Sequence, residues 1–421
     1  MSNVVPEGWA VTSIGELTKK DSLFSDGDWV ESKDQDPNGS NRLIQLADIG
    51  DGRFINKSSR YLNDEQFERL NCTTLRKNDV LVARMPEPLG RACLYPLDNA
   101  RAATIVDIAI IRTPNADHKW LMSAINSSDY RADIELNASG TTRTRIARGA
   151  LSKLKLIAPP LPEQKKIAAI LTSVDDVIEK TQAQIDKLKD LKTGMMQELL
   201  TSGVGVDGKP HSEFKDSPVG RIPKGWDCCL LDKVARRGSG HTPDKKKSEY
   251  WNDGVKWVSL TDSSKLDKLY ISDTAKKISQ LGIENSSATL HPKGTVVMAR
   301  DAGVGKSAIM TSSMAVSQHF MAWVCGEKLD NYFLYYLLQH WKPQFEAIAM
   351  GSTIKTIGLP YFKKLQIPVP SIEEQRVISG ALKSVDNKMF ALERKHKQLT
   401  NTKKALMQDL LTGKVRVKVE G

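Results

Sequence analysis

The sequence lacks the features of membrane, secreted and metal-binding proteins. It has no run of about 18 apolar residues, so we expect no segment that crosses a membrane. Its first residues, MSNVVPEGWAVTS, show no basic region followed by an apolar stretch, which argues against a secretory signal. The cysteines have neither CxxC spacing nor a nearby histidine, and they are Cys72, Cys93, Cys228, Cys229 and Cys325. We therefore expect reduced thiols in a cytoplasmic protein, without a disulfide framework or a zinc site.

Motifs for catalysis are also missing. Gly303 to Ser307 reads GVGKS, but a Walker A loop needs a glycine where Arg300 stands, so we interpret this stretch as a glycine turn that presents a basic side chain. No glycine-rich methyltransferase turn, nuclease carboxylate cluster or recognisable nucleophile is found. Glu163-Gln164-Lys165 is interpreted as helix capping and solvated charge. We expect no enzyme activity and no cofactor or metal bound by this chain.

Positive charge is concentrated in the second half of the chain, which has a formal net charge of +11. Residues 1–162 carry 21 basic and 21 acidic side chains, whereas residues 201–373 carry 23 and 17, a net of +6. A stretch without any acid, residues 139–155, reads SGTTRTRIARGALSKLK. This balance favours a polyanionic partner, although many ordinary proteins are equally basic.

One long segment is present twice, at an offset of 211 residues. Residues 163–200 end in MQELL and residues 374–411 end in MQDLL, and neither copy contains proline. Each has apolar residues at alternating steps of four and three, the heptad pattern of a coiled coil. At about 1.5 Å per residue each helix would be roughly 57 Å long. The predicted seam consists of Ile167, Leu171, Val174, Ile178, Thr181, Ile185, Leu188, Lys192, Met195 and Leu199 in the first copy, and of Ile378, Leu382, Val385, Met389, Leu392, His396, Leu399, Lys403, Leu406 and Leu410 in the second.

The regions before the two helices also repeat each other. Pro223-Lys224-Gly225-Trp226 matches Pro6-Glu7-Gly8-Trp9, and a proline turn precedes each helix. Four further segments of the first region match segments of the second: 42–48 matches 256–262, 80–84 matches 296–300, 89–91 matches 304–306, and 140–146 matches 351–357. The chain is therefore one module used twice. We expect a first globular domain at 1–160, a central helix at 161–203, a second globular domain at 204–370, and a C-terminal helix with its tail at 371–421.

Apolar runs in the first domain predict strands at 42–49, 78–84 and 104–111, and helices at 119–125 and 130–136. The fold class is thus α/β, with two similar domains and two long helices. The economical pairing of these helices is antiparallel, which relates the two modules by a pseudo-two-fold axis. Duplex DNA has a local two-fold axis at every base pair, and this match of symmetries favours a DNA-binding protein.

Basic and amide side chains at matching places in the two modules are the candidate contacts to DNA. Arginine can bind guanine through two hydrogen bonds, glutamine can bind adenine in the same way, and lysine can hold phosphates. For any single residue, a solvated surface charge is the simpler interpretation. The candidates are Arg84, Arg91, Arg143, Arg145 and Arg148 in the first module, and Lys245, Lys246, Lys247, Arg300, Lys306, Gln318, His319 and Lys355 in the second.

The order of these elements resembles the specificity subunit of Type I restriction-modification systems. The resemblance rests on the duplicated PxGW start, the Gly-Ser/Thr-Thr segment, the proline turn and the long helix ending in MQ[ED]LLT. It implies two target-recognition domains that each read one half of a bipartite DNA site, with the helices as an antiparallel spacer. It also implies docking of two modification (methyltransferase) subunits, and of restriction subunits in the full complex. S-adenosylmethionine and ATP with magnesium would belong to those partners.

Three other functions remain open from the sequence. The chain could be a non-enzymatic coiled-coil adaptor with two protein-binding domains, or the specificity subunit of a related two-sided cutting system. A self-sufficient nuclease or methyltransferase is the third. Sequence-selective DNA binding that needs both domains would exclude the adaptor, and direct assay of the purified chain would exclude the enzyme.

Overall fold

The structure is a computed structural model of the chain, and it describes residues 5–98, 101–140, 144–351 and 353–419. The chain divides into two compact units. Unit 1 contains residues 1–181 and 395–421, and unit 2 contains residues 182–394. Each unit thus holds a globular part and a section of both long helices, α6 (Leu161–Leu199) and α11 (Ile372–Leu411).

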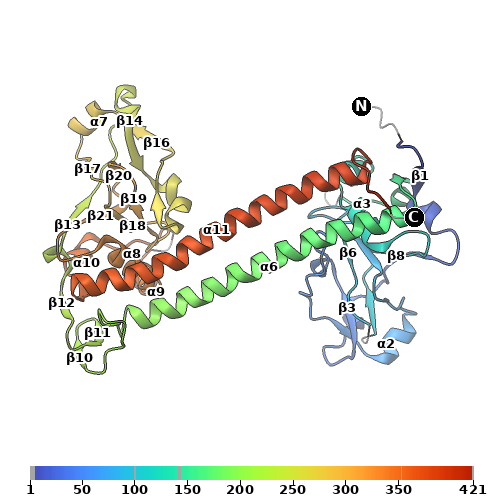
Figure 1. Ribbon diagram of the computed structural model, residues 1–421, viewed down its shortest axis with the longest axis horizontal. Helices are drawn as coiled ribbons and strands as arrows, with labels where there is room; N and C mark the ends of the chain where they lie inside the picture. Colours follow the sequence, from blue (N-terminus) through green and yellow to red (C-terminus); the bar gives the residue numbers. More distant parts are fainter. Residues whose placement is uncertain (1–4, 99–100, 141–143, 352, 420–421) are drawn as a thin grey trace. The chain divides into compact units, whose positions relative to one another are not determined.

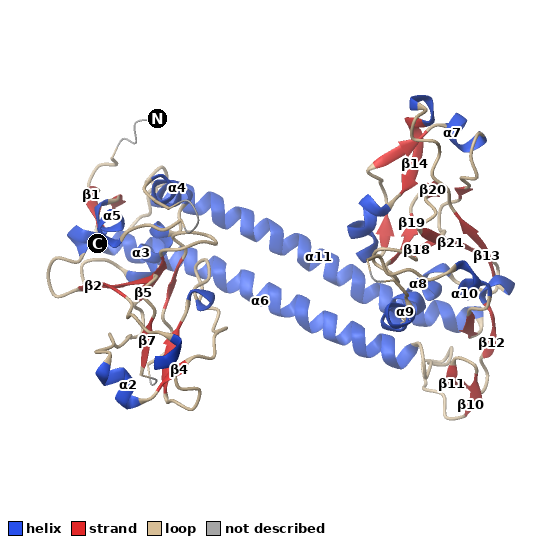
Figure 2. Cartoon of the chain, turned by 180° about the vertical axis from the view of Figure 1, so that it is seen from behind, coloured by secondary structure: helices blue, strands red, loops and turns tan. Residues whose placement is uncertain are grey.

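Unit 1 has two main sheets. The larger has the strand order β2-β8-β5-β6 and the smaller the order β4-β3-β7, while β1 pairs with β9 just before α6. Figure 2 shows the short helix α2 beside β4, where Phe67 and Leu62 pack together. The strands are β1 (Ala10–Ser13), β2 (Leu23–Asp26), β3 (Asn41–Ile44), β4 (Tyr61–Leu62), β5 (Val80–Ala83), β6 (Ala92–Leu94), β7 (Ala102–Thr104), β8 (Ile108–Arg112) and β9 (Lys155–Ala158). The helices are α1 (Ile14–Leu17), α2 (Asp64–Arg69), α3 (His118–Ile125), α4 (Ser128–Leu136) and α5 (Arg148–Lys153).

The central strand β5 is buried on both faces, which explains its unbroken apolar sequence. Val80 and Val82 pack with α3, α4 and the ends of the long helices, whereas Leu81 and Ala83 pack toward the smaller sheet. Because side chains alternate along a strand, one four-residue strand serves both layers of the core. The helices and the two sheets of unit 1 therefore form three layers.

Unit 2 repeats this plan with larger sheets. Their strand orders are β13-β21-β18-β19-β15 and β16-β14-β20-β17, and β12 pairs with β22 as β1 does with β9. Figure 1 shows the neighbouring strands β13, β21 and β18 of the first of these sheets. The strands are β10 (Phe214–Ser217), β11 (Gly220–Pro223), β12 (Asp227–Leu230), β13 (Ala235–Ser239), β14 (Trp251–Val258), β15 (Tyr270–Ile271), β16 (Lys276–Ile278), β17 (Leu290–His291), β18 (Val296–Ala299), β19 (Ser307–Met310), β20 (Met314–Val316), β21 (Phe320–Cys325) and β22 (Gln366–Val369). The helices are α7 (Gln280–Glu284), α8 (Asn331–His340), α9 (Lys342–Ile348) and α10 (Leu359–Lys363).

The two long helices pack together in an antiparallel direction, as the repeat predicts. In unit 1, Lys403 of α11 forms an ion pair of 2.6 Å with Asp175 of α6. In unit 2, Lys192 of α6 pairs at 2.7 Å with Asp386 of α11, which also accepts a hydrogen bond from Tyr336. In both units a residue from the first part of one helix meets a residue from the last part of the other. The seam residues of both helices are buried or half-buried along their whole length.

A buried glutamate at the start of each long helix fixes the globular part of its unit. Glu163 is only 4% exposed and accepts hydrogen bonds from the indole of Trp9 and from Arg416. In unit 2, Glu374 accepts from the indole of Trp226 at 3.0 Å, from the Val204 amide, and pairs with His211. The expectation of solvated charge at Glu163 is therefore wrong, because its carboxylate is buried and accepts hydrogen bonds from the buried indole of Trp9 and from Arg416.

Replacing Glu374 by alanine is expected to destabilise unit 2 by on the order of 3 kcal/mol. The change leaves the buried indole N–H of Trp226 and the amide of Val204 without an acceptor, and buried donors without partners are costly. Urea unfolding followed by tryptophan fluorescence measures the effect. Glu373→Ala is the matched control, because Glu373 is an exposed neighbour on the same helical turn. Equal unfolding midpoints for the two variants would contradict this role.

Candidate nucleic-acid interface

Three segments of the chain meet at one place in each unit. In unit 1 the amide of Arg84, after β5, donates to Asp107 in the β7–β8 turn, and its carbonyl accepts from Ile146. In unit 2 the amide of Arg300 donates to His319, and its carbonyl accepts from Ile357. The glycine-threonine segment, the strand end and the following turn are thus joined in the same way twice. We call each of these places the three-segment junction.

Two of the predicted arginines are buried inside unit 1 and bond to its own groups. The guanidinium of Arg84 is buried, donates to the Ile146 and Val106 carbonyls, and forms an ion pair with Asp26. Burial lowers the pKa of Arg84, and Asp26 partly offsets this effect. Arg91 is also buried and donates to four backbone carbonyl oxygens, those of Leu46, Ile49, Met85 and Pro88. These arginines hold loops in place, and we do not include them among the proposed DNA contacts.

Two other arginines stand at the open side of the same junction. Arg145 lies 3.4 Å from Asp107, and Arg148 lies 3.9 Å from Asp26, with side chains 40% and 48% exposed. Each keeps N–H groups that face solvent, so each can donate to a base edge or a phosphate. Arg143, the remaining candidate of unit 1, lies outside the described residues.

The corresponding region of unit 2 contains a hollow of about 480 Å³. The predicted residues Lys245, Gln318 and His319 line it, and the ring centroids of Trp251 and Trp257 lie 5.1 Å apart in an edge-to-face arrangement in its wall. Gly240 brings the chain that carries Thr242 against Val316, so closely that a Cβ at this glycine would lie 1.6 Å from the Val316 carbonyl oxygen. The remaining lining residues are Thr242, Ser259, Leu260, Thr261, Lys276 and Ser317.

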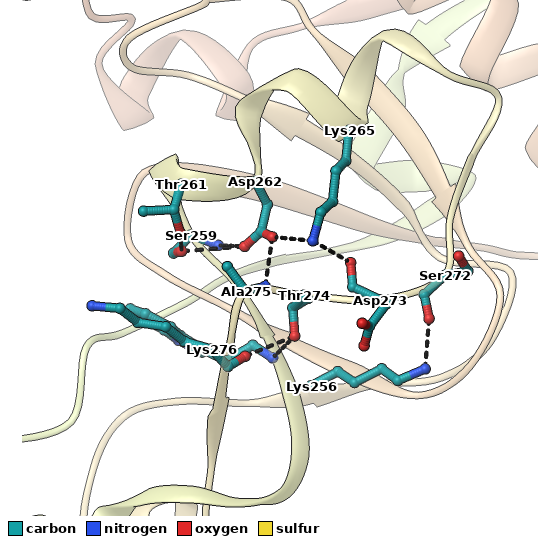
Figure 3. Close-up of polar contacts among 11 residues, drawn as sticks. Lys256, Ser259, Thr261, Asp262, Lys265, Ser272, Asp273, Thr274, Ala275 and Lys276 are labelled. Carbon is teal, nitrogen blue, oxygen red and sulfur yellow. Dashed lines mark hydrogen bonds and ion pairs between the residues drawn. The ribbon is translucent and has the colours of Figure 1, made fainter. Parts of the chain in front are cut away.

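A buried aspartate holds one wall of this hollow, as Figure 3 shows. Asp262 is 0% exposed and accepts hydrogen bonds from the amide and hydroxyl of Ser259, from the amide of Ala275 and from Lys265. It thereby ties the 310 turn at Leu260–Asp267 to the loop that precedes Lys276. Ser259 in the wall is thus positioned by a carboxylate that is itself hidden from solvent, and the same carboxylate holds Ala275, the residue before Lys276.

Unit 1 uses an aspartate in the same role. Asp48 is 0% exposed and accepts from the amides of Gln45, Lys57 and Ser58. The predicted strand at 42–49 therefore ends at Ile44, because the carboxylate caps a 310 turn at Leu46–Asp48 instead. Sequence reasoning aligned these segments but missed the aspartates, although both stand at the same position of the repeat.

The other candidates in unit 2 are dispersed. Lys246, Lys247 and Lys355 are exposed, as is Lys245 at the hollow. The ammonium of Lys247 donates to the Tyr250 hydroxyl, and this hydrogen bond raises the pKa of Lys247. Arg300 is mostly buried beside Asp301 at 3.3 Å. Lys306 is half-buried at the turn that joins β18 to β19. There the Gly305 amide donates to Ala299, so the chain makes a tight hairpin turn in place of a phosphate loop.

The described residues contain neither a candidate metal site nor a candidate membrane span. Within those residues, no group of three or more histidine, cysteine or acidic side chains is placed to hold a metal ion. Over the same part of the chain, no helix is both long and apolar enough to cross a bilayer.

Known proteins match the chain over most of its length. The family described as Type I restriction modification DNA specificity domain matches twice, at residues 6–190 and 223–401. The Type I restriction enzyme MjaVIII specificity subunit of Methanocaldococcus jannaschii is 30% identical over 430 residues, which cover 98% of this chain and 94% of that protein. The HindI specificity subunit of Haemophilus influenzae is 22% identical and covers 89% of this chain and 94% of its own.

Solved structures share the fold. A crystal structure of the S subunit of a Type I restriction-modification system from M. genitalium matches with a TM-score of 0.60 at 16% identity, over 96% of both chains. A chain from a study of complex assembly and conformational transition of the type I R-M system gives the same TM-score at 18% identity, over 98% of this chain and all of that one. The repeated α/β units and paired helices are thus a known arrangement.

Proposed function

The chain belongs to the family of Type I restriction-modification DNA specificity subunits, and we propose that its two units read the two halves of one bipartite DNA site. As a member of that family it is the component that supplies DNA specificity, and it is not catalytic. In the proposal, residues 1–160 and 204–370 are the target-recognition domains. The helices at 161–203 and 371–421 set the distance between the half-sites.

One observation supports the proposal that the two units read different half-sites. Both three-segment junctions have the same backbone frame, but the side chains that reach solvent from it differ. Unit 1 presents Arg145 and Arg148, whereas unit 2 presents Gln318 and His319 beside a hollow. In unit 1 these groups leave the segment that follows the glycine-threonine stretch, and in unit 2 they leave the β20–β21 turn. Different groups select different bases. Such an arrangement supports two unlike half-sites.

The catalytic steps are assigned to partner subunits in this proposal. Two modification subunits, which use S-adenosylmethionine, would dock on this chain and methylate both half-sites. Restriction subunits, which use ATP and magnesium, would join them in the full complex. The internal repeat supports two modification subunits per chain, because in this proposal the long helix of each module binds one of them.

Methylation mapping in a host with and without this gene tests the proposal. We expect loss of the gene to abolish methylation at one motif made of two specified segments separated by an unspecified gap of constant length. Complementation with the gene should restore the same motif. A motif that is continuous, or one that persists without the gene, would contradict the proposed function.

A further inference from the structure

A chain of hydrogen bonds fixes one amide at the edge of the hollow in unit 2. Asp301 is 7% exposed and lies 2.7 Å from Nδ1 of His319. Nε2 of His319 lies 3.4 Å from Nε2 of Gln318, and the hydroxyl of Thr242 donates to Oε1 of Gln318 at 2.5 Å. The imidazole of His319 thus connects a buried carboxylate to an exposed carboxamide, which Thr242 holds from the other side.

The carboxylate determines the direction of the first bond in this chain. Asp301 also pairs with Arg300, so it acts as an acceptor and His319 must donate from Nδ1. In the tautomer with the proton on Nδ1, Nε2 is an acceptor, which matches the amide N–H of Gln318. Thr242 donates to the amide oxygen from the other side. The carboxamide of Gln318 therefore has one orientation, with its oxygen toward Thr242 and its nitrogen toward His319.

Each atom of this fixed amide keeps one more hydrogen-bonding position. A carboxamide oxygen has two lone pairs and its nitrogen two hydrogens, and within the described residues one of each is used. Gln318 is exposed, and the adjoining hollow leaves room for a ligand to approach its edge. Ser317, which is 1% exposed and lines the same hollow, has a hydroxyl without a partner in the described part of the chain. The site therefore has fixed polar groups that can still form hydrogen bonds with a ligand.

We propose that Gln318 reads the adenine of one A·T base pair in the half-site of unit 2, an inference that rests on the proposed function. Adenine shows an acceptor, N7, beside a donor, its N6 amino group, in the major groove. This pattern complements one N–H and one oxygen of a fixed carboxamide. Guanine shows two acceptors, so its O6 would face Oε1 of Gln318 and repel it. Thr242 and His319 act as positioning residues, because they hold the amide in the orientation that matches adenine and keep its N–H from turning toward O6 of a guanine.

Unit 1 lacks this arrangement at the equivalent place. Its β7–β8 turn has Val106 and Asp107 where unit 2 has Gln318 and His319. Asp107 there pairs with Arg145, which offers donors only. Adenine selection by an amide is therefore a property of unit 2 alone at this position, and the effect of changing Gln318 should be confined to one half-site.

Single-atom substitution in DNA tests the inference. The complex of this chain with its modification subunits is titrated with duplexes that carry the mapped site, in which 7-deazaadenine replaces each adenine of the unit 2 half-site in turn, on either strand. Removing N7 leaves base pairing intact. We expect wild-type binding to weaken by about tenfold at one position. Gln318→Ala should bind the normal and the 7-deaza duplex equally at that position, and Thr242→Val should reduce the difference.

Gln280→Ala is the matched control, because Gln280 is an exposed glutamine on α7 whose amide bonds Glu284. This variant should retain the wild-type penalty. The inference is overturned if Gln318→Ala keeps the same 7-deazaadenine penalties as wild type, or if no adenine of the half-site shows one. Exchange of the whole unit 2 recognition domain distinguishes failure of the proposed function from failure of the role of Gln318. If that exchange changes the recognised half-site while Gln318→Ala keeps the wild-type 7-deazaadenine penalties, only the role of Gln318 is wrong.

Discussion

Insertion of seven residues into both long helices is expected to lengthen the unread gap of the DNA site by up to about three base pairs. A heptad keeps the apolar seam in register, so the helices can still pair. It adds about 10 Å at 1.5 Å per residue. DNA has about 10 base pairs per 34 Å, and tilt between the helices and the DNA axis would reduce the shift.

The helix register shows where to insert. Lys192 pairs with Asp386, and in an antiparallel pair residue numbers at one level keep a constant sum, here 578. Glu393 therefore stands level with Ile185, within one turn of Gln182, and insertions near Gln182 and Glu393 fall at facing levels. Methylation mapping of this double variant gives the new gap.

A single insertion provides the control for the spacer hypothesis. Seven residues added near Gln182 alone have no counterpart in α11, so the seam must bulge and assembly should weaken. The hypothesis fails if the double variant is stable and methylates sites with the original gap. It also fails if the single insertion changes the gap as much as the double one.

The sequence predicted the helices better than it predicted their polar contacts. Heptad spacing needs only the position of apolar residues, and the helices at 161–199 and 372–411 followed from it. Lys192 and Lys403 appeared on the seam as polar interruptions without an explanation. The structure supplies one, since each lysine meets an aspartate of the other helix. These ion pairs depend on which residues of the two antiparallel helices lie at the same level. The apolar periodicity of a single helix does not determine that alignment.

The strands were predicted in place but not in length. One apolar run at 104–111 is two strands, β7 and β8, because the chain turns at 105–107 and continues in another sheet. Apolar periodicity cannot separate these strands, since both are buried. The turn matters for function, because Asp107 in it pairs with Arg145.

Burial distinguishes arginines that were equivalent candidates for DNA contact in the sequence. Arg84 and Arg145 both belong to basic segments, yet Arg84 is enclosed by backbone carbonyl oxygens and Arg145 remains 40% exposed. Which arginine is enclosed depends on how three distant segments meet. Local composition does not show how distant segments pack together. The sequence therefore identifies basic candidate residues but does not show which of them are buried.

Replacing residues 1–158 by the equivalent segment of a relative is expected to change one half-site completely. Ala158 ends β9, which pairs with β1, so the exchanged segment contains the whole β1–β9 ladder and stops before α6 begins at Leu161. Trp9 lies in the exchanged segment and bonds Glu163, which stays. The donor must therefore have tryptophan at the position of Trp9, or the hybrid loses a buried hydrogen bond and its folding is affected.

The methylation map of this hybrid tests the division of reading between the two units most directly. The hybrid is expressed with the unchanged modification subunits, and methylated positions are mapped across the genome. We predict a motif in which one half is new, matching the donor, while the other half and the gap length are those of the parent. A hybrid that assembles but alters both halves, or neither, would contradict the account.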